Sequence, residues 1–440
     1  MELQVEKLVY GGDGLARLPA DEHGRGKTVF LPFVLPGERV DATLTESRRG
    51  FARAKLNKVV TPSADRIGPQ CPYFGRCGGC QYQHISYEAQ LRFKAEILRE
   101  TLRRTAKLDL ATEIVAHPSE PWQYRNRTRM RLQPAPAFGL GYFRGNSHEL
   151  LPVEQCPISS PLINQTIAAV WELGWAGKVP VTVHGLQFFA NHDDSAILVE
   201  VYVRPQSEAG EAESFARVLI SQLGAITGVA LFATSPVEDE SRQLAPLTSI
   251  HNEDATVTGA AGLTYHAAGH DYRVSAGSFF QTNRFLVDEL VQAATAGVSG
   301  NTALDLYAGV GLFTLPLAAK FAEVVAVEAS PHAVADLKHN AAGNVKPFRA
   351  TTEAFLEQQA ARLKPDFILL DPPRAGLGDK ATAALGRASA GQVTLVSCDP
   401  ATLSRDLRQL LESGFRVEQA HLFDLFPQTA HMETVVRLVR

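Results

Sequence analysis

The spacing of hydrophobic residues changes along the chain and divides it into segments of different predicted structure. As far as about residue 60, short β-type runs such as residues 28–31 and 53–56 are separated by glycine and proline. This pattern is typical of a small β-barrel. Farther along, up to about residue 265, strand-like and helix-like runs alternate, for example at residues 196–203 and 215–223. The alternation indicates a mixed α+β domain.

From Thr302 onward the strands and helices alternate regularly. Residues 303–307 are an expected strand, 308–311 a tight glycine turn, 312–320 a helix and 324–327 the next strand. Such a β-α-β pattern predicts an α/β fold with a Rossmann-like sheet.

These patterns predict an α/β protein built from four parts. They are a β-barrel at 1–60, a cysteine-containing region at 61–115, a central α+β domain at 116–268 and a cofactor-binding domain at 269–440. A chain of 440 residues is too long for one ordinary core, which agrees with two to four domains. Within the second part, residues 87–104 are expected to form a surface helix whose acidic and basic side chains pair with one another.

Composition places the chain among folded soluble proteins, with 45% hydrophobic and 20% charged residues. No apolar stretch approaches the length of a transmembrane helix, and no secretory signal is visible at the N-terminus. We therefore expect a cytoplasmic protein without a membrane partner. The net charge of −4 does not by itself indicate nucleic acid, so local clusters of charge carry more information.

Arginines occupy every second position of one short segment. If residues 124–132 form a strand, these side chains share one face at a spacing of about 6.6 Å. The positions are Arg125, Arg127, Arg129 and Arg131. Like charges on one face repel one another unless a polyanion, or acids distant in the sequence, lie opposite them. We predict that this strand binds nucleic acid, with a surface strand paired to distant acids as the alternative.

Four cysteines have the spacing of a metal site. Cys71, Cys77 and Cys80 lie within ten residues, and Cys156 follows at a distance. A disulfide framework is not expected in a chain without an export signal, and closely spaced thiolates usually hold a soft metal. Zinc would accept four thiolates. However, the step of six residues from Cys71 to Cys77 is not that of a paired zinc ribbon, so the spacing favours an iron–sulfur cluster.

The glycine turn of the last domain is a candidate nucleoside site. Gly309 and Gly311 allow a ligand to approach the backbone, and Glu328 lies about 20 residues beyond, where an acid can hold ribose hydroxyls. The third glycine of the dinucleotide fingerprint is missing and Asp305 precedes the turn, so S-adenosylmethionine fits better than NAD. A purely structural glycine turn remains the alternative.

The fifth cysteine, Cys398, ends an apolar run that is rich in β-branched residues. Asp399 and Pro400 follow and favour a turn into the next helix. A thiol at the end of a buried strand is a candidate nucleophile, although free cysteine is also a common small buried residue.

Together these motifs resemble the RNA 5-methyluridine methyltransferases, a family of class I enzymes that depend on S-adenosylmethionine. The resemblance rests on residues 278–283, 371–376, 397–398 and 424–433. The four cysteines match the iron–sulfur subgroup of this family, and the first sixty residues resemble its TRAM barrel. The chain departs from the family at Asp399, where the usual residue is Asn, at Leu395, where it is Tyr, and at Leu312, where it is often Asn or Thr.

The resemblance implies two cofactors, S-adenosylmethionine and a 4Fe–4S cluster. The implied cluster ligands are Cys71, Cys77, Cys80 and Cys156. The implied cofactor-binding residues are Gln281, Tyr307, Gly309, Gly311, Leu312, Glu328 and Asp371. Asp371 could instead orient the edge of the uracil. The implied partner is RNA, with 23S ribosomal RNA preferred over transfer RNA, and we expect a monomer.

The reaction implied for this family requires a nucleophile and a base. C5 of uracil is a poor nucleophile, so Cys398 is expected to add to C6 and activate C5 for methylation, after which Glu433 removes the C5 proton. The ordinary alternative for Glu433 is a salt bridge on an edge strand. Because the base has to leave its stack to react, a loop or single-stranded target is expected.

The alternative functions differ in how well they fit the motifs. A transfer RNA uridine-C5 methyltransferase would use the same residues. A cytosine-C5 RNA enzyme would also use a cysteine, but the Phe-Pro-Gln run that leads to Glu433 favours uridine. A non-catalytic iron–sulfur RNA-binding protein would lack Cys398, Glu433 or the glycine turn. A radical S-adenosylmethionine enzyme would need three cysteines spaced three and two residues apart, which the chain does not have.

Overall fold

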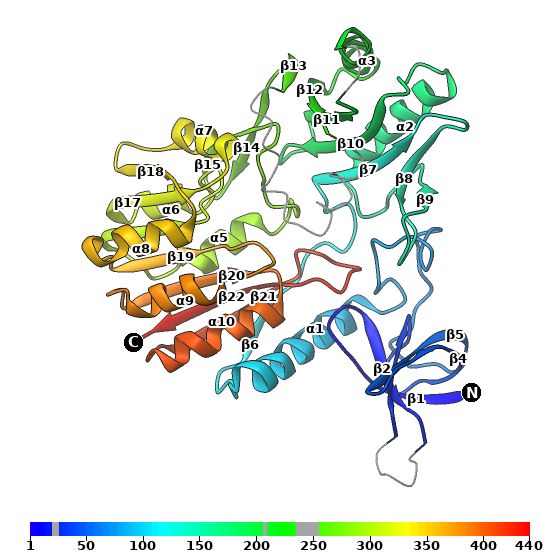
Figure 1. The fold of residues 1–440 in the computed structure, drawn as a ribbon, viewed down its shortest axis with the longest axis horizontal. Helices are drawn as coiled ribbons and strands as arrows, with labels where there is room; N and C mark the ends of the chain where they lie inside the picture. Colours follow the sequence, from blue (N-terminus) through cyan, green and yellow to red (C-terminus); the bar gives the residue numbers. More distant parts are fainter. Residues whose placement is uncertain (20–25, 206–208, 235–254) are drawn as a thin grey trace.

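The N-terminal segment forms a closed five-stranded barrel in the computed structural model, which describes residues 1–19, 26–205, 209–234 and 255–440. The strands follow the order β1-β2-β3-β5-β4 around the barrel. Their bounds are β1 (Glu2–Leu8), β2 (Asp13–Arg17), β3 (Thr28–Pro32), β4 (Arg39–Ser47) and β5 (Phe51–Thr61). Alternate residues of β1 point into an apolar core with Val29 and Leu31. The predicted barrel is confirmed, and it lies at one end of the molecule (Figure 1).

The C-terminal part is built on an eight-stranded sheet of order β18-β17-β16-β19-β20-β22-β21-β6. The strands from β18 to β20 run parallel, whereas β22 is antiparallel to both of its neighbours. The bounds are β6 (Ile114–His117), β16 (Gly300–Leu306), β17 (Phe321–Glu328), β18 (Val345–Arg349), β19 (Phe367–Leu370), β20 (Gln392–Ser397), β21 (Arg416–Phe423) and β22 (Glu433–Val439). The predicted Rossmann-like α/β sheet is thus confirmed.

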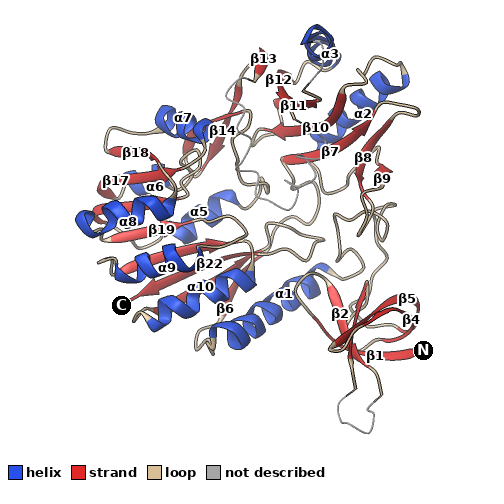
Figure 2. Ribbon diagram, in the orientation of Figure 1, coloured by secondary structure: helices blue, strands red, loops and turns tan. Residues whose placement is uncertain are grey.

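Helices cover both faces of this sheet (Figure 2). Side chains of its central strands are therefore apolar in both directions, as in other parallel sheets buried between helices. Leu304 and Leu306 face one layer of helices, while Ala303 faces the other. The first layer contains α1 (Tyr87–Thr101), the π-helical turn η1 (Leu102–Ala106), α8 (Thr352–Leu363), α9 (Gly378–Arg387) and α10 (Pro400–Glu412). The second contains α5 (Val287–Thr295), α6 (Thr314–Ala318) and α7 (Pro331–Asn340).

Residues that precede the central domain in sequence contribute to this same core. β6 pairs with β21 in parallel, and α1 packs Phe93 and Ile97 among the side chains of the first helix layer. The prediction of an ordinary surface helix at 87–104 was wrong, because Gln90 and Lys94 are buried. The cysteine-containing region thus supplies α1 to the core beneath the cofactor-binding sheet.

The central domain is a seven-stranded sheet of order β13-β12-β11-β10-β7-β8-β9, with two helices on one face. The strands are β7 (Arg127–Gln133), β8 (Gly139–Phe143), β9 (Leu150–Pro152), β10 (Val183–Ala190), β11 (Ile197–Val203), β12 (Ile226–Ala233) and β13 (Thr256–Gly259). The helices are α2 (Pro161–Trp175) and α3 (Ala209–Gln222), and a hairpin of β14 (Gly262–Ala267) and β15 (His270–Ser275) follows. The opposite face of the sheet shares an apolar core with this hairpin and with α5, so the two domains are packed together.

In the part of the chain that the structure describes, no helix is both long and apolar enough to cross a membrane.

Candidate active site

The carboxyl ends of four neighbouring parallel strands carry the predicted site residues. β16 leads into the glycine turn, β17 ends on Glu328, β19 is followed by Asp371, and β20 is followed by Cys398. Because parallel strands end at one edge of a sheet, the four segments meet there, where open α/β sheets bind their ligands.

The glycine turn is held in its shape by Glu328. Its carboxylate accepts the Gly309 N–H at 2.9 Å through Oε2, and the N–H groups of Ala329 and Ser330 through Oε1 at 2.8 and 2.7 Å. Gly311 has a φ of +99°, which L-residues rarely adopt, and a Cβ there would lie 3.0 Å from Leu337. A Cβ on Gly309 would meet no atom within 4 Å, so this side of the turn is open to a ligand.

Two further predicted residues flank the turn. Tyr307 has a φ of +62°, which directs the chain from β16 into the glycine turn. Leu312 is buried, and its carbonyl accepts the Tyr272 hydroxyl at 3.0 Å. Beneath the turn, Asp305 is fully buried and accepts a hydrogen bond from Thr314, and burial raises its pKa to about 7. The backbone on either side of the turn is therefore held in place, while the space next to Gly309 is free for a nucleoside cofactor.

Gln281 and Asp371 come together although 90 residues separate them. The Gln281 side-chain amide donates to Asp371 Oδ2 at 3.3 Å. Burial raises the pKa of Asp371 to about 7, and the hydrogen bond from Gln281 opposes this rise. In the sheet, β19, which leads to Asp371, lies between β16, which leads to the glycine turn, and β20, which leads to Cys398.

The Cys398 thiol is half-buried and poorly ionised in the absence of ligands. Burial and then Glu433, with Asp371 and Asp399, raise its pKa to about 12, against the opposing effect of Arg374. A helix N-terminus such as that of α10 stabilises a neighbouring thiolate when its first N–H groups are free. Its first N–H groups instead bind Asp399, whose Oδ1 accepts Ala401 and Thr402 at 2.9 Å each.

Glu433 lies across from Cys398 at the start of β22. In the antiparallel pairing of β20 and β22, Ser397 stands opposite Thr434, so the next pair in the same register is Cys398 and Glu433. β22 is an inner strand, between β20 and β21, and not an edge strand. Glu433 is 3% exposed, and burial followed by Asp371 raises its pKa well above the usual range, while Arg374 lowers it.

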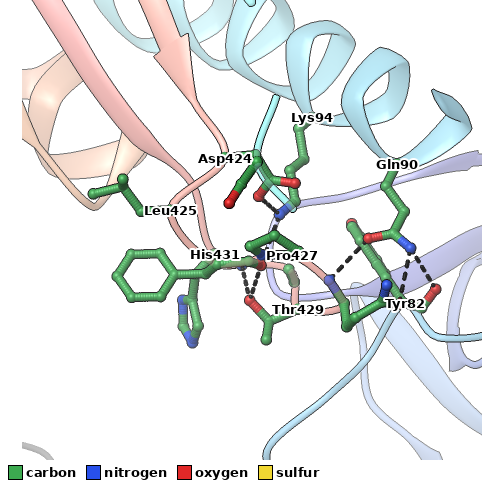
Figure 3. Close-up of polar contacts among 12 residues, drawn as sticks. Tyr82, Gln90, Lys94, Asp424, Leu425, Pro427, Thr429 and His431 are labelled. Carbon is green, nitrogen blue, oxygen red and sulfur yellow. Dashed lines mark hydrogen bonds and ion pairs between the residues drawn. The ribbon is translucent and has the colours of Figure 1, made fainter. Parts of the chain in front are cut away.

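Helix α1 holds the loop that leads to Glu433 (Figure 3). Lys94 and Asp424 are fully buried and form an ion pair at 2.6 Å, and the Lys94 ammonium also donates to the Phe426 carbonyl at 3.1 Å. The Gln90 side chain accepts the Gln428 backbone N–H at 2.9 Å and donates to the Gln428 side chain at 3.0 Å. These contacts were not predicted from the sequence.

The four clustered cysteines line one cavity of about 440 Å³. Burial and then the neighbouring Cys156 raise the pKa of Cys80 to about 12. Among the described residues, no three His, Cys, Asp or Glu side chains are arranged to hold a single metal ion. A four-iron cluster binds each thiolate through a different iron, so its ligands need not converge on one point. Buried N–H groups of Arg125 and Arg127, two further residues of this cavity, have no hydrogen-bond partner. The cavity, its thiols and these donors fit a bulky anionic group.

The predicted arginine stripe is largely enclosed. Arg127 is 5% exposed, donates to the Ser278 carbonyl at 2.7 Å and lies 4.1 Å from the centre of the Phe189 ring. Arg129 lies 3.8 Å from the centre of the Tyr202 ring, and Arg131 is 9% exposed. Contact of these arginines with RNA stays a prediction.

A parallel sheet with an open glycine turn, strand-end acids and a thiol defines the class of nucleoside-cofactor methyltransferases. Comparison with known proteins identifies the family. The model of the tRNA (uracil-5-)-methyltransferase family matches residues 86–440, and that of the TRAM domain matches residues 1–56. The chain belongs to this family: it is an S-adenosylmethionine-dependent RNA uracil-C5 methyltransferase with an N-terminal TRAM domain.

Relatives match over almost the whole chain. It is 33% identical to the 23S rRNA (uracil(1939)-C(5))-methyltransferase RlmD of Shewanella frigidimarina, over 99% of this chain and 95% of the relative. It is 32% identical to an uncharacterized RNA methyltransferase of Streptomyces avermitilis, over 99% and 97%. Among solved structures, the Pyrococcus abyssi tRNA (uracil-54, C5)-methyltransferase in complex with S-adenosyl-L-homocysteine has the same fold, with a TM-score of 0.75, 22% identity and complete coverage of both chains.

Proposed function

We propose that this chain methylates C5 of a uridine in 23S ribosomal RNA, with Cys398 as the nucleophile and Glu433 as the base. The observation that carries the assignment is the pairing of β20 with β22. It sets one buried carboxyl group beside the thiol, at the edge of the sheet that also carries the glycine turn.

In the proposed reaction, Cys398 loses its thiol proton to solvent, the resulting thiolate forms a bond to C6, and electron density moves to C5. S-adenosylmethionine would be held at the glycine turn and would supply an electrophilic methyl group to C5, with S-adenosylhomocysteine as the leaving group. The C5 proton then passes to the Glu433 carboxylate, the sulfur–C6 bond breaks, and the C5–C6 double bond is restored. Arg374 favours the charged forms of both Cys398 and Glu433.

A mechanism-based adduct tests both roles. RNA that carries 5-fluorouridine at the target has no C5 proton to lose, so wild-type protein with S-adenosylmethionine should accumulate a covalent complex. Cys398→Ala should form none, and an adduct as abundant as that of wild type would exclude Cys398 as the nucleophile. Glu433→Gln should accumulate an adduct even with ordinary uridine; prompt turnover would exclude it as the base.

The preference for ribosomal RNA rests on the relatives named RlmD, which match at 32–33% identity over 99% of the chain. Transfer of labelled methyl groups to 23S rRNA and to transfer RNA, both transcribed without modification, measures the preference directly. Product confined to transfer RNA would overturn it. A ribosomal substrate also supports action in the cytoplasm. We also expect a monomer, which sedimentation can check.

We further propose that Cys71, Cys77, Cys80 and Cys156 bind a 4Fe–4S cluster. The shared cavity and its buried arginine donors support this, because four thiolates around such a cluster leave a net negative charge. Protein purified without oxygen should be brown, contain about four irons per chain and bleach in air. A colourless protein with stoichiometric zinc would contradict the proposal.

The arginine strand is proposed to assist RNA binding mainly by its positive field, because Arg127 and Arg131 are buried. Replacing Arg129 by Gln should then weaken RNA binding and reduce its dependence on salt. An unchanged dissociation constant at low salt would remove Arg129 from the RNA-binding surface.

A further inference from the structure

The turn between β1 and β2 carries the barrel into contact with the methyltransferase domain. Gly12 N–H donates to the Val9 carbonyl at 3.2 Å, and Gly11 has a φ of +100°, so residues 9–12 form a tight turn that requires glycine. A Cβ on Gly12 would lie 2.8 Å from Gln81 Cβ and 3.3 Å from Ala430 Cβ. The turn therefore packs directly on the loop that leads to Glu433.

Tyr10, at the tip of this turn, reaches the residue that follows the nucleophile. Its hydroxyl donates to Asp399 Oδ2 at 3.0 Å, across 389 residues of sequence. Burial and then the Asp399 carboxylate raise the pKa of Tyr10 well above its usual range, so the hydroxyl keeps its proton and acts as a donor. Its ring packs against the apolar core that contains Ala430 and Met432.

Both carboxylate oxygens of Asp399 are therefore engaged. Oδ1 accepts the first N–H groups of α10, and Oδ2 accepts Tyr10. Asp399 is the residue at which this chain departs from the usual Asn. A carboxylate binds a tyrosine hydroxyl more strongly than an amide oxygen does. The same negative charge lies next to Cys398 and opposes its ionisation, so a hydroxyl that binds the carboxylate and fixes its position limits that cost.

We propose that Tyr10 is a positioning residue of the active site: its bond to Asp399 fixes the turn that carries Cys398 and joins the barrel to the catalytic strand. The proposal rests on the role of Cys398 proposed above. It assigns the barrel a part in completing the active-site wall.

The test is a double-mutant cycle of Tyr10→Phe and Asp399→Asn. The readouts are the RNA dissociation constant and the single-turnover rate constant of adduct formation on 5-fluorouridine RNA. Tyr10→Phe removes one oxygen and should lower the rate constant about tenfold, the size of a charge-assisted hydrogen bond, with less than a twofold change in RNA affinity. In the Asp399→Asn background the same substitution should change the rate constant less than about threefold, because the charged acceptor is gone.

The pH dependence of adduct formation separates positioning from general stability. The charged groups that act on Cys398 are Glu433, Arg374, Asp371 and Asp399. Tyr10→Phe should move the profile to higher pH, because the carboxylate is then less well neutralised. Asp399→Asn should move it to lower pH, with or without Tyr10.

A matched control destabilises the barrel without changing the hydrogen bond between Tyr10 and Asp399. Val29→Ala removes two methyl groups from the barrel core and should leave the rate constant within twofold of wild type. The inference is overturned if Tyr10→Phe reacts as fast as wild type, if its effect is equal in both backgrounds, or if Val29→Ala causes the same loss. A parallel reaction with Cys398→Ala distinguishes the failure of the two proposals. An adduct formed without Cys398 would exclude Cys398 as the nucleophile. If Cys398 is required but Tyr10→Phe has no effect, only the role of Tyr10 is excluded.

Discussion

The buried ion pair between Lys94 and Asp424 gives a sharp test of how the catalytic loop is held. Lys94→Met keeps an unbranched side chain of similar length but leaves the Asp424 carboxylate, which is fully buried, without its cation. Breaking one side of such a pair typically costs about 3–5 kcal/mol. The substitution also removes the hydrogen bond from Lys94 to the Phe426 carbonyl. We therefore expect a loss of about 3–5 kcal/mol in the free energy of unfolding.

Urea unfolding followed by circular dichroism measures this loss of stability. Two further variants show whether the loss comes from the unpaired buried charge. Lys94→Met/Asp424→Asn leaves no buried charge and should be less destabilised than Lys94→Met alone. Lys7→Met breaks an ion pair with Glu100 that is partly exposed, and should cost at most about 1 kcal/mol. Adduct formation should slow in Lys94→Met, since the loop before Glu433 loses an anchor. A loss in Lys94→Met no greater than in Lys7→Met would refute the reasoning.

Two further substitutions have defined outcomes. Gly311→Ala should weaken the binding of S-adenosylmethionine measured by calorimetry, because a Cβ is strained at a φ of +99° and meets Leu337. The control is Gly37→Ala, where φ is +82° and no atom lies within 4 Å of the added Cβ. It should destabilise the fold and leave the affinity for S-adenosylmethionine unchanged. Burial, assisted by Arg66, lowers the pKa of His84 from 6.5 to about 4, so the unfolded chain binds the proton first and stability falls as the pH drops through this interval. His84→Gln should flatten that fall in urea unfolding at pH 7 and 5; an unchanged slope would show that His84 is not the group responsible.

The positions of Glu328, Asp371 and Cys398 at one edge could be predicted because they depend on a local rule. Each follows a short apolar run, and parallel strands end together. The strand expected at residues 324–327 lies within β17. Glu433 required more, because its place depends on β22 returning antiparallel between two strands. Its motif indicated a role, but its register against Cys398 is visible only in the structure.

The contacts that hold the site could not be predicted from the sequence pattern, because they join segments that are hundreds of residues apart. Lys94 was read as one of many charges on a surface helix. It lies between Phe93 and Ile97, on the same helical face as buried residues at the 3.6-residue spacing, and this is the signal that could have identified it. Tyr10 gives no comparable signal, since nothing in a barrel turn indicates that its partner is the residue after the nucleophile.

The charges around Cys398 explain why several hydrogen bonds and an ion pair hold the segments next to its thiol. Glu433, Asp371 and Asp399 all disfavour the thiolate, and Arg374 is the cation that opposes them. With a pKa raised to about 12, the thiol is predominantly protonated at pH 7. Formation of the bond to C6 therefore requires loss of the thiol proton to solvent. Glu433, the base that later removes the C5 proton, has to be unprotonated at that step, and Arg374 favours its charged form. The pairing of β20 with β22 fixes Cys398 and Glu433 relative to each other. Lys94 and Gln90 hold the loop that leads to Glu433, and Tyr10 holds the turn that follows Cys398.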